Sequence, residues 1–259
     1  FVYLILSDKN NGRKFEFTYN VELEESNSRV EVWIPVPPSN EVQHIESMIL
    51  NHKGMNCSLL IEQNHQNEYY YCTANKLIKP VNLTLICSIR RKEHGATQYN
   101  NVFPQNYGKG TNNRTVPEGA LFQDIITEQS LNKNNVRNIY DYVLSGMHYG
   151  KPKSTAEEDL YYSGKNPKTG ELWLPSDEVF GRKQVSKDDV VNVYIKSEND
   201  KTDYTFGNGN SIYACNIGVG NCTDYHSYFI SLCRTLNIPS RFHIGFSIPD
   251  KENESEGKI

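Results

Sequence analysis

The chain has 259 residues, of which 37% are hydrophobic and 11% aromatic, and this is enough apolar material for two domains with modest cores. Its 27 basic and 31 acidic residues are mixed along the sequence and leave a formal net charge of -4, which gives no positive field for nucleic acid and no basic amphipathic stretch for a membrane surface. Because no apolar run reaches the length of an integral membrane segment, we expect the partner to be a protein, a peptide or a small molecule.

The first residues, FVYLILS, permit two interpretations. They can form a first β-strand, or they can be the end of the apolar region of an export signal whose basic start is absent. The segment is too short to decide between the two, so export stays open.

Alternation of apolar and polar residues predicts β-strands through the first third of the chain. KFEFTYNVELE, residues 14–24, and RVEVWIPVP, residues 29–37, both have a period of two, and the polar turn between them predicts a hairpin. We therefore predict an antiparallel β-sandwich over residues 1–95, with Cys87 facing inward. The other short strands that we expect lie at 45–50, 58–62, 69–73 and 81–89.

The composition changes after this region. Residues 96–118 are rich in Asn, Gly and Pro without a period, which predicts a linker. EGALFQDIITEQ, residues 118–129, then favours a short helix, and residues 134–152 favour a longer one, capped by Asn134 or Asn135 and stopped at Gly150 and Pro152. The apolar stripe expected on that longer helix consists of Val136, Ile139, Tyr140, Val143, Leu144 and Met147.

Residues 150–212 are polar and show no sustained period, so we expect loops there. Long loops of this kind often border a binding cleft, although nothing in them specifies a ligand. Aromatic residues interrupt the segment at Tyr161, Tyr162, Trp173 and Phe180.

The six cysteines are dispersed, without a C-x-x-C pair or a zinc-type spacing with histidine, so we expect neither a metal nor a cofactor. An even count fits disulfides in an exported protein, and buried free thiols explain most of the cysteines equally well. The compartment is therefore unknown from the sequence.

Cys222 stands at the start of a predicted helix over residues 222–236, which ends at Asn237 before Pro239. The buried stripe expected on it consists of Tyr225, Phe229, Leu232, Cys233 and Leu236. The first N–H groups of a helix lack intrahelical partners and carry the positive end of the macrodipole, so they favour a thiolate over a thiol and can donate to an oxyanion. By itself this pattern fits a small buried cysteine as well as a nucleophile.

The whole stretch GNCTDYHSYFISLCRTLNIPSRFHIGF, residues 220–246, resembles the catalytic segment of the transglutaminase-like superfamily. Asn237 stands where that family usually has glycine, which a left-handed helix cap tolerates, and Ser240 replaces alanine. The N-terminal strands also resemble the β-domain that precedes this segment in bacterial members. The matching residues are Gly220, Cys222, Asp224, Tyr225, Phe229, Leu232, Arg234, Ile238, Pro239, Arg241 and Gly245.

This resemblance implies an α+β protein in which an antiparallel β-sandwich-like domain precedes a papain-type core at residues 119–259. It implies Cys222 as the nucleophile, with Gly220 and Asn221 shaping the site or the oxyanion hole. The family's triad histidine and aspartate would lie on strands after residue 259, so we expect the 259 residues to be a fragment whose core is incomplete and which is itself inactive.

The other polar residues of the segment receive structural roles. His226 lies on the helix of Cys222, and His243 precedes the position of the family's histidine, on a strand expected over residues 240–246. Asp224 is expected to stabilise the helix start, and Arg241 to pair with a carboxylate in the fold.

The family chemistry implied is acyl transfer through a thioester on a protein or peptide amide. We expect hydrolysis by a cysteine peptidase or amidase first, and transamidation second. The alternative is a transglutaminase-like scaffold or protein-binding module without turnover.

Overall fold

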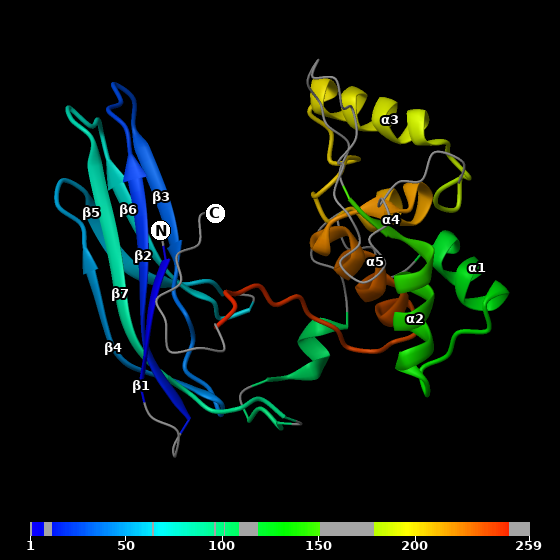
Figure 1. Ribbon diagram of the computed structural model, residues 1–259, viewed down its shortest axis with the longest axis horizontal. Helices are drawn as coiled ribbons and strands as arrows, with labels where there is room; N and C mark the ends of the chain where they lie inside the picture. Colours follow the sequence, from blue (N-terminus) through cyan, green and yellow to red (C-terminus); the bar gives the residue numbers. More distant parts are fainter. Residues whose placement is uncertain are drawn as a thin grey trace. The chain divides into compact units, whose positions relative to one another are not determined.

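The computed structural model describes residues 2–7, 12–63, 65–95, 97–100, 102–108, 119–150 and 179–248. These residues form two compact units, one containing residues 1–102 with the segment from Gly245 on, and the other containing residues 103–244. We call them the β unit and the helical unit. Antiparallel sheets followed by helices make this an α+β fold, as predicted (Figure 1). The predicted boundaries at 1–95, 96–118 and 119–259 remain predictions.

The β unit consists of two antiparallel sheets, which Figure 1 shows as the layered blue-to-cyan arrows. One sheet has the strand order β1-β2-β7-β4 and the other the order β3-β6-β5. The strands are β1 (Val2–Ser7), β2 (Arg13–Leu23), β3 (Val30–Pro35), β4 (Gln43–Asn51), β5 (Asn56–Ile61), β6 (Glu68–Ala74) and β7 (Val81–Arg91). Each strand expected from the alternation is present, and FVYLILS contains β1.

The alternating residues form one core between the sheets. Phe15 and Phe17 on β2 and Leu83 and Leu85 on β7 turn inward from the first sheet, while Ile34 on β3 turns inward from the second. Cys87 is fully buried among them, as predicted, and burial raises the pKa of its thiol to about 11. This arrangement is the two-layer packing that a period of two predicts when one face of each sheet is buried.

The predicted hairpin of β2 and β3 is wrong. β2 pairs with β1 and β7, whereas β3 pairs with β6 in the other sheet. Residues 24–29 carry the chain from one layer to the other, and Ser26 forms an isolated bridge with Leu77 on the way. Alternation fixes which face of a strand is buried, but both layers of a sandwich satisfy the same pattern, so the partner of a strand cannot be read from it.

Cys57 and Cys72 form a disulfide between the edge strand β5 and the central strand β6, where they are direct cross-strand partners. The other cysteines are free, and Cys87, Cys215 and Cys233 are buried. The chain thus has one disulfide-bonded pair and three buried free thiols, and the question of export stays open.

Removal of this disulfide should destabilise the β unit. A bridge that closes a loop of 15 residues restricts the unfolded chain by about 3 kcal/mol. We expect dithiothreitol to lower the free energy of unfolding of the wild type by about that amount, measured by denaturant titration with circular dichroism. The variant Cys57→Ala/Cys72→Ala should unfold at the lower value with or without the reductant, and equal stability of oxidised and reduced wild type would contradict this.

Glu46 on β4 lies at the centre of an ion network on the outer face of the first sheet. Its carboxylate is 2.7 Å from Lys14 Nζ and 2.9 Å from Arg90, and it also accepts a hydrogen bond from Ser88. The hydrogen bonds from Lys14 and Arg90 lower the pKa of Glu46 from its ordinary value of 4.5 to about 2.

The sign of this shift gives a pH dependence. A carboxylate with a lowered folded pKa stabilises the protein above its unfolded pKa, and this contribution is lost as the pH falls. The wild type should therefore be more stable than Glu46→Gln near neutrality, and the difference should vanish between about pH 4.5 and pH 2. Parallel urea titrations across this range measure it. A difference that stays constant down to pH 2 would show that the charge is not responsible.

The helical unit is built around α5 (Cys222–Thr235), which packs against α1 (Ala120–Glu128), α2 (Val136–Gly146) and α4 (Ser211–Ile217) (Figure 1). Their shared core includes Phe122, Ile139, Ala214, Leu232 and Cys233. The remaining elements are a short 3₁₀ helix (Pro104–Tyr107), β8 (His148–Tyr149), α3 (Lys187–Asp200) and β9 (Val219–Gly220).

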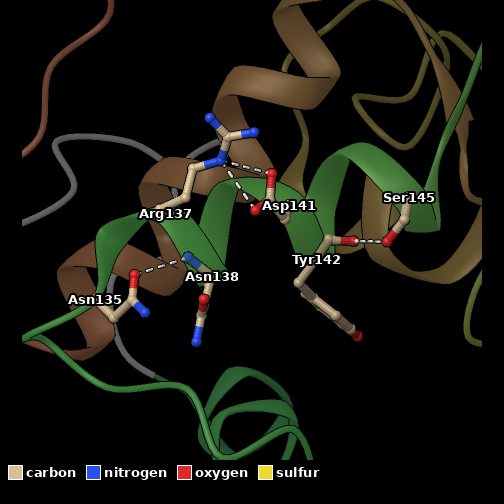
Figure 2. Close-up of polar contacts among 6 residues, drawn as sticks. All are labelled: Asn135, Arg137, Asn138, Asp141, Tyr142 and Ser145. Atoms are coloured by element: carbon tan, nitrogen blue, oxygen red, sulfur yellow. Dashed lines mark hydrogen bonds and ion pairs between the residues drawn. The ribbon is translucent and has the colours of Figure 1, made fainter.

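α2 begins as predicted and ends earlier. Figure 2 shows the side chain of Asn135 accepting the backbone N–H of Asn138 at the helix start, and the ion pair of Arg137 with Asp141 one turn on. The helix ends at Gly146 instead of continuing to Gly150. Half of the predicted stripe is buried, namely Ile139, Val143 and Met147, whereas Val136, Tyr140 and Leu144 are exposed.

The expectation of loops throughout residues 150–212 is wrong where α3 and the start of α4 lie. Residues 151–178, which include Tyr161, Tyr162 and Trp173, lie outside the described residues. α3 starts with a capping box, because Ser186 and Asp189 exchange side-chain-to-backbone hydrogen bonds. It contributes Val190 to a small core around Phe180 and Tyr213. The Ser-x-x-Asp pattern was present in the sequence, and five of the six residues after it are apolar, so the start of this helix could have been predicted from residues 186–195.

Candidate active site

The backbone leading to Cys222 is held by close contacts between glycines. Gly218 ends α4 in the left-handed conformation, with φ of 67°. A Cβ on Gly218 would lie 2.4 Å from the nitrogen of Gly181, so no side chain fits between the two segments. β9 then pairs in parallel with β8, and Gly150 donates its N–H to the carbonyl of Gly220. The two residues before the α5 cap are thus fixed by a neighbouring strand.

α5 starts with a capping box formed by Asn221 and Asp224. The side chain of Asn221 accepts the N–H of Thr223, and the carboxylate of Asp224 accepts the N–H of Asn221 at 3.0 Å. This arrangement confirms the predicted role of Asp224 at the helix start. It also places Cys222 at the first helical position, one residue after the cap.

Asp224 does more than cap the helix. Its side chain is fully buried, and it also accepts the N–H groups of Gly207 at 2.8 Å and Gly209 at 3.3 Å. Burial raises the pKa of Asp224 above its ordinary 3.8, while the three backbone N–H groups oppose that shift. These two partners lie 17 and 15 residues upstream of Asp224, beyond the reach of a local capping pattern.

The capping network leaves one backbone donor available at the start of α5. The N–H groups of Asn221 and Thr223 are taken by side chains, and those of Asp224 and Tyr225 donate to the carbonyl of Asn221. Among the residues that the structure describes, only the N–H of Cys222 in this turn has no acceptor. An oxyanion formed at Cys222 would therefore meet the nucleophile's own N–H group first.

Cys222 is exposed, whereas the other free cysteines among the described residues, Cys87, Cys215 and Cys233, are buried. Burial raises the pKa of the Cys215 and Cys233 thiols, as it does for Cys87, so these groups stay protonated and sheltered. The structure thus distinguishes one thiol from three others by its access to solvent and by its place at a helix start.

The two predicted site-shaping residues have different roles. Gly220 is buried, and a Cβ there would lie 2.6 Å from the Cβ and from Oδ2 of Asp224, so its lack of a side chain makes room for the carboxylate. The N–H of Asn221 is bound to Asp224, whereas no acceptor for its side-chain Nδ2 occurs within the described ranges. Of the two, only Asn221 retains a group that can face a substrate.

Aromatic side chains surround the exposed turn. Nδ1 of His226 lies 2.5 Å from the carbonyl oxygen of Cys222, and it is the donor because a carbonyl can only accept. The ring of His226 meets the ring of Phe242 edge-on, with 4.9 Å between the ring centroids. Tyr225 donates its hydroxyl to the carbonyl of Met147 and packs at 6.0 Å against Tyr149. His226 is thus committed to its own helix, in agreement with a structural role.

The predicted strand over residues 240–246 is absent. These residues form no ladder in the described part of the chain, and Phe242, His243 and Ile244 are exposed. A strand exists only when a second strand satisfies its N–H and C=O groups, and no such partner occurs among the described residues. Arg241, expected on a carboxylate, lies over the ring of Tyr107 at 5.3 Å.

The body of α5 is buried on more than the predicted stripe. Ser227, Tyr228, Ile230 and Ser231 are buried together with Leu232 and Cys233, so the helix is central to its unit. It ends as predicted, with Asn237 in the left-handed conformation at φ of 59°. Arg234 is buried near this end and donates to the carbonyl of Ser240.

Within the described residues, no cluster of His, Cys, Asp or Glu side chains could hold a metal ion. None of the helices in the described ranges is long and apolar enough to cross a membrane.

The fold and the exposed thiol at a helix start can be compared with those of known proteins. Residues 181–258, which include Cys222, match the family model described as the transglutaminase-like superfamily. A solved structure, described as that of a candidate cysteine protease from Cytophaga hutchinsonii, has the same fold with a TM-score of 0.51 and 12% identity. The match covers 92% of this chain and 67% of that chain. No curated protein matches the sequence.

Proposed function

We propose that the protein is a cysteine-dependent acyltransferase that acts on protein or peptide amides, with Cys222 as its nucleophile. The observation that carries this proposal is the position of Cys222. It is exposed at the first residue of α5, a largely buried helix that starts with the capping box of Asn221 and Asp224. The match of residues 181–258 to the transglutaminase-like superfamily supports the same chemistry.

The reaction begins with attack of the Cys222 sulfur on the amide carbonyl. The bond from sulfur to carbon forms, the carbonyl oxygen becomes an oxyanion, and the N–H of Cys222 donates to it. Our candidate for a second donor is Nδ2 of Asn221, which has no acceptor within the described residues. Collapse of this intermediate expels the amine and leaves a thioester on Cys222. We assign the proton transfer to a histidine after residue 259, which takes the thiol proton of Cys222 and gives it to the departing amine.

Water or an amine then attacks the thioester. Attack by water releases a carboxylic acid and completes hydrolysis, whereas attack by a primary amine forms a new amide and completes transamidation. We favour hydrolysis, because the solved protein that shares this fold is described as a candidate cysteine protease.

The second candidate function is a binding module without turnover. Its support is that His226, the histidine one turn after Cys222 on α5, donates to the carbonyl of Cys222 and packs its ring against Phe242. In this case the β unit or the exposed turn would recognise a protein partner and no thioester would form.

A product analysis with the full-length protein separates these functions. The protein is incubated with a peptide library, with and without a labelled primary amine, and the products are identified by mass spectrometry. Hydrolysis predicts shortened peptides or new carboxylates in both samples, and transamidation predicts label incorporated into the peptides. Unchanged peptides in both samples would reject acyl transfer and favour the binding module.

A further inference from the structure

Asp224 has more hydrogen-bond partners than a helix cap needs. A capping box requires only the bond from the N–H of Asn221 to the carboxylate, and exposed residues serve this purpose elsewhere in the chain, as Asp189 does for α3. Burial of a carboxylate is costly unless hydrogen bonds compensate for it. The additional bonds from Gly207 and Gly209 supply that compensation and join a distant loop to the start of α5.

The conformation of this loop is adapted to the carboxylate. Gly207 and Gly209 have φ values of 80° and 66°, in the region that favours glycine. In this conformation both N–H groups point to the same side chain, although Asn208 lies between them. Backbone N–H groups that converge in this way form a site for an anion, and Asp224 is the anion that occupies it.

The anchored loop lies directly along the turn that carries the nucleophile. A Cβ on Gly207 would be 3.2 Å from Nδ2 of Asn221, and one on Gly209 would be 2.8 Å from Cγ2 of Thr223. The loop therefore contacts the residue before Cys222 and the residue after it.

We propose that Asp224 is a positioning residue for the reaction at Cys222, because its carboxylate holds residues 207–209 as a wall of the substrate groove. This inference rests on the proposed acyl transfer. Asp224 does not touch the substrate. It acts through the two glycine N–H groups, and it also accepts the N–H of Asn221, the residue before the nucleophile.

The variant Asp224→Asn tests whether the carboxylate is needed to hold residues 207–209, apart from its role in capping α5. An amide has one carbonyl oxygen, so it cannot replace both Oδ2, which accepts from Gly207 and Asn221, and Oδ1, which accepts from Gly209. At least one loop bond is therefore lost. We expect the KM of the full-length protein for a peptide substrate to rise about tenfold, which corresponds to the loss of one buried hydrogen bond.

The rate at which iodoacetamide alkylates Cys222 should change by less than about twofold, because this small reagent needs no groove. Amide exchange measured by NMR should accelerate at Gly207 and Gly209 and stay slow in the body of α5. A role limited to global stability predicts another pattern, in which every amide of α5 exchanges faster and KM is unchanged.

Asp189→Asn is the matched control, since it removes the carboxylate of the α3 capping box without touching this loop. Its KM should equal that of the wild type. If Asp224→Asn does not fold, Gly207→Ala perturbs the wall from the loop side while the carboxylate is intact, and KM should rise again. An unchanged KM in both variants would overturn the positioning role alone. Absence of turnover in the wild type would overturn the acyl transfer and the positioning role together.

Discussion

Replacing Cys222 with alanine should lower the kcat/KM of the full-length protein for a peptide amide by about four orders of magnitude or more. The sulfur forms the covalent bond in the proposed reaction, and no other free thiol of the chain is exposed. Removal of a covalent nucleophile leaves only the rate enhancement from binding and from oxyanion stabilisation. Steady-state kinetics on purified wild type and Cys222→Ala measure this effect.

Cys233→Ala gives the matched control. Cys233 is buried in the core of the helical unit, so its truncation should lower stability by about 1 kcal/mol while the kcat of the folded protein is retained. Cys222→Ala should show the reverse pattern, with an unchanged melting temperature and no turnover. Activity that survives in Cys222→Ala would place the nucleophile elsewhere.

The second large effect is expected for Gly220→Ala. The added methyl group would lie 2.6 Å from the Cβ and Oδ2 of Asp224, a distance that real contacts do not reach, so the carboxylate must move. Movement of Asp224 breaks bonds to Gly207, Gly209 and Asn221 inside a buried region. We expect the free energy of unfolding of the helical unit to fall by about 2–4 kcal/mol from overpacking and lost hydrogen bonds.

The same substitution at Gly146 is the control for Gly220→Ala. A Cβ on Gly146 meets no atom within 4 Å, and the residue ends α2. Alanine there should leave stability unchanged or raise it slightly, since it restricts the unfolded chain. Denaturant titrations followed by circular dichroism compare the two variants. Equal stabilities for Gly220→Ala and Gly146→Ala would mean that the carboxylate relaxes without cost.

Local patterns in the sequence predicted local structure well. Alternation located the strands of the β unit, the choice between Asn134 and Asn135 marked the start of α2, and the helix predicted from Cys222 is α5. These features depend on neighbours within a few residues, so periodicity and capping rules apply to them directly. The place of Cys222 at the first position of α5 belongs to this group.

Features that depend on distant partners could not be predicted in this way. β3 pairs with β6 instead of β2, and Asp224 binds a loop that precedes it by 15 residues or more. In both cases the local pattern is satisfied by several partners, and tertiary packing selects one. The same limit explains the segment at 240–246, where a strand-like sequence lacks a paired strand within the described residues.

The position of the Gly207–Gly209 loop changes the interpretation of the site. The sequence motif around Cys222 indicated the nucleophile and the helix, but a groove also needs walls, and one of them comes from a loop with no catalytic motif. Two glycines two residues apart, before a capped helix, were the signal available. Together with the buried carboxylate of Asp224, these two glycines mark the backbone that a substrate would pass in the proposed arrangement.

Direct capture of the covalent intermediate tests the central claim most sharply. The full-length protein is mixed with a peptide amide or activated ester, quenched in acid within the first turnover, digested, and analysed by mass spectrometry. We expect an acyl group on the peptide that contains Cys222, and neutral hydroxylamine should remove it because it is held as a thioester. An acyl group on another residue, or none at Cys222 while products accumulate, would contradict it.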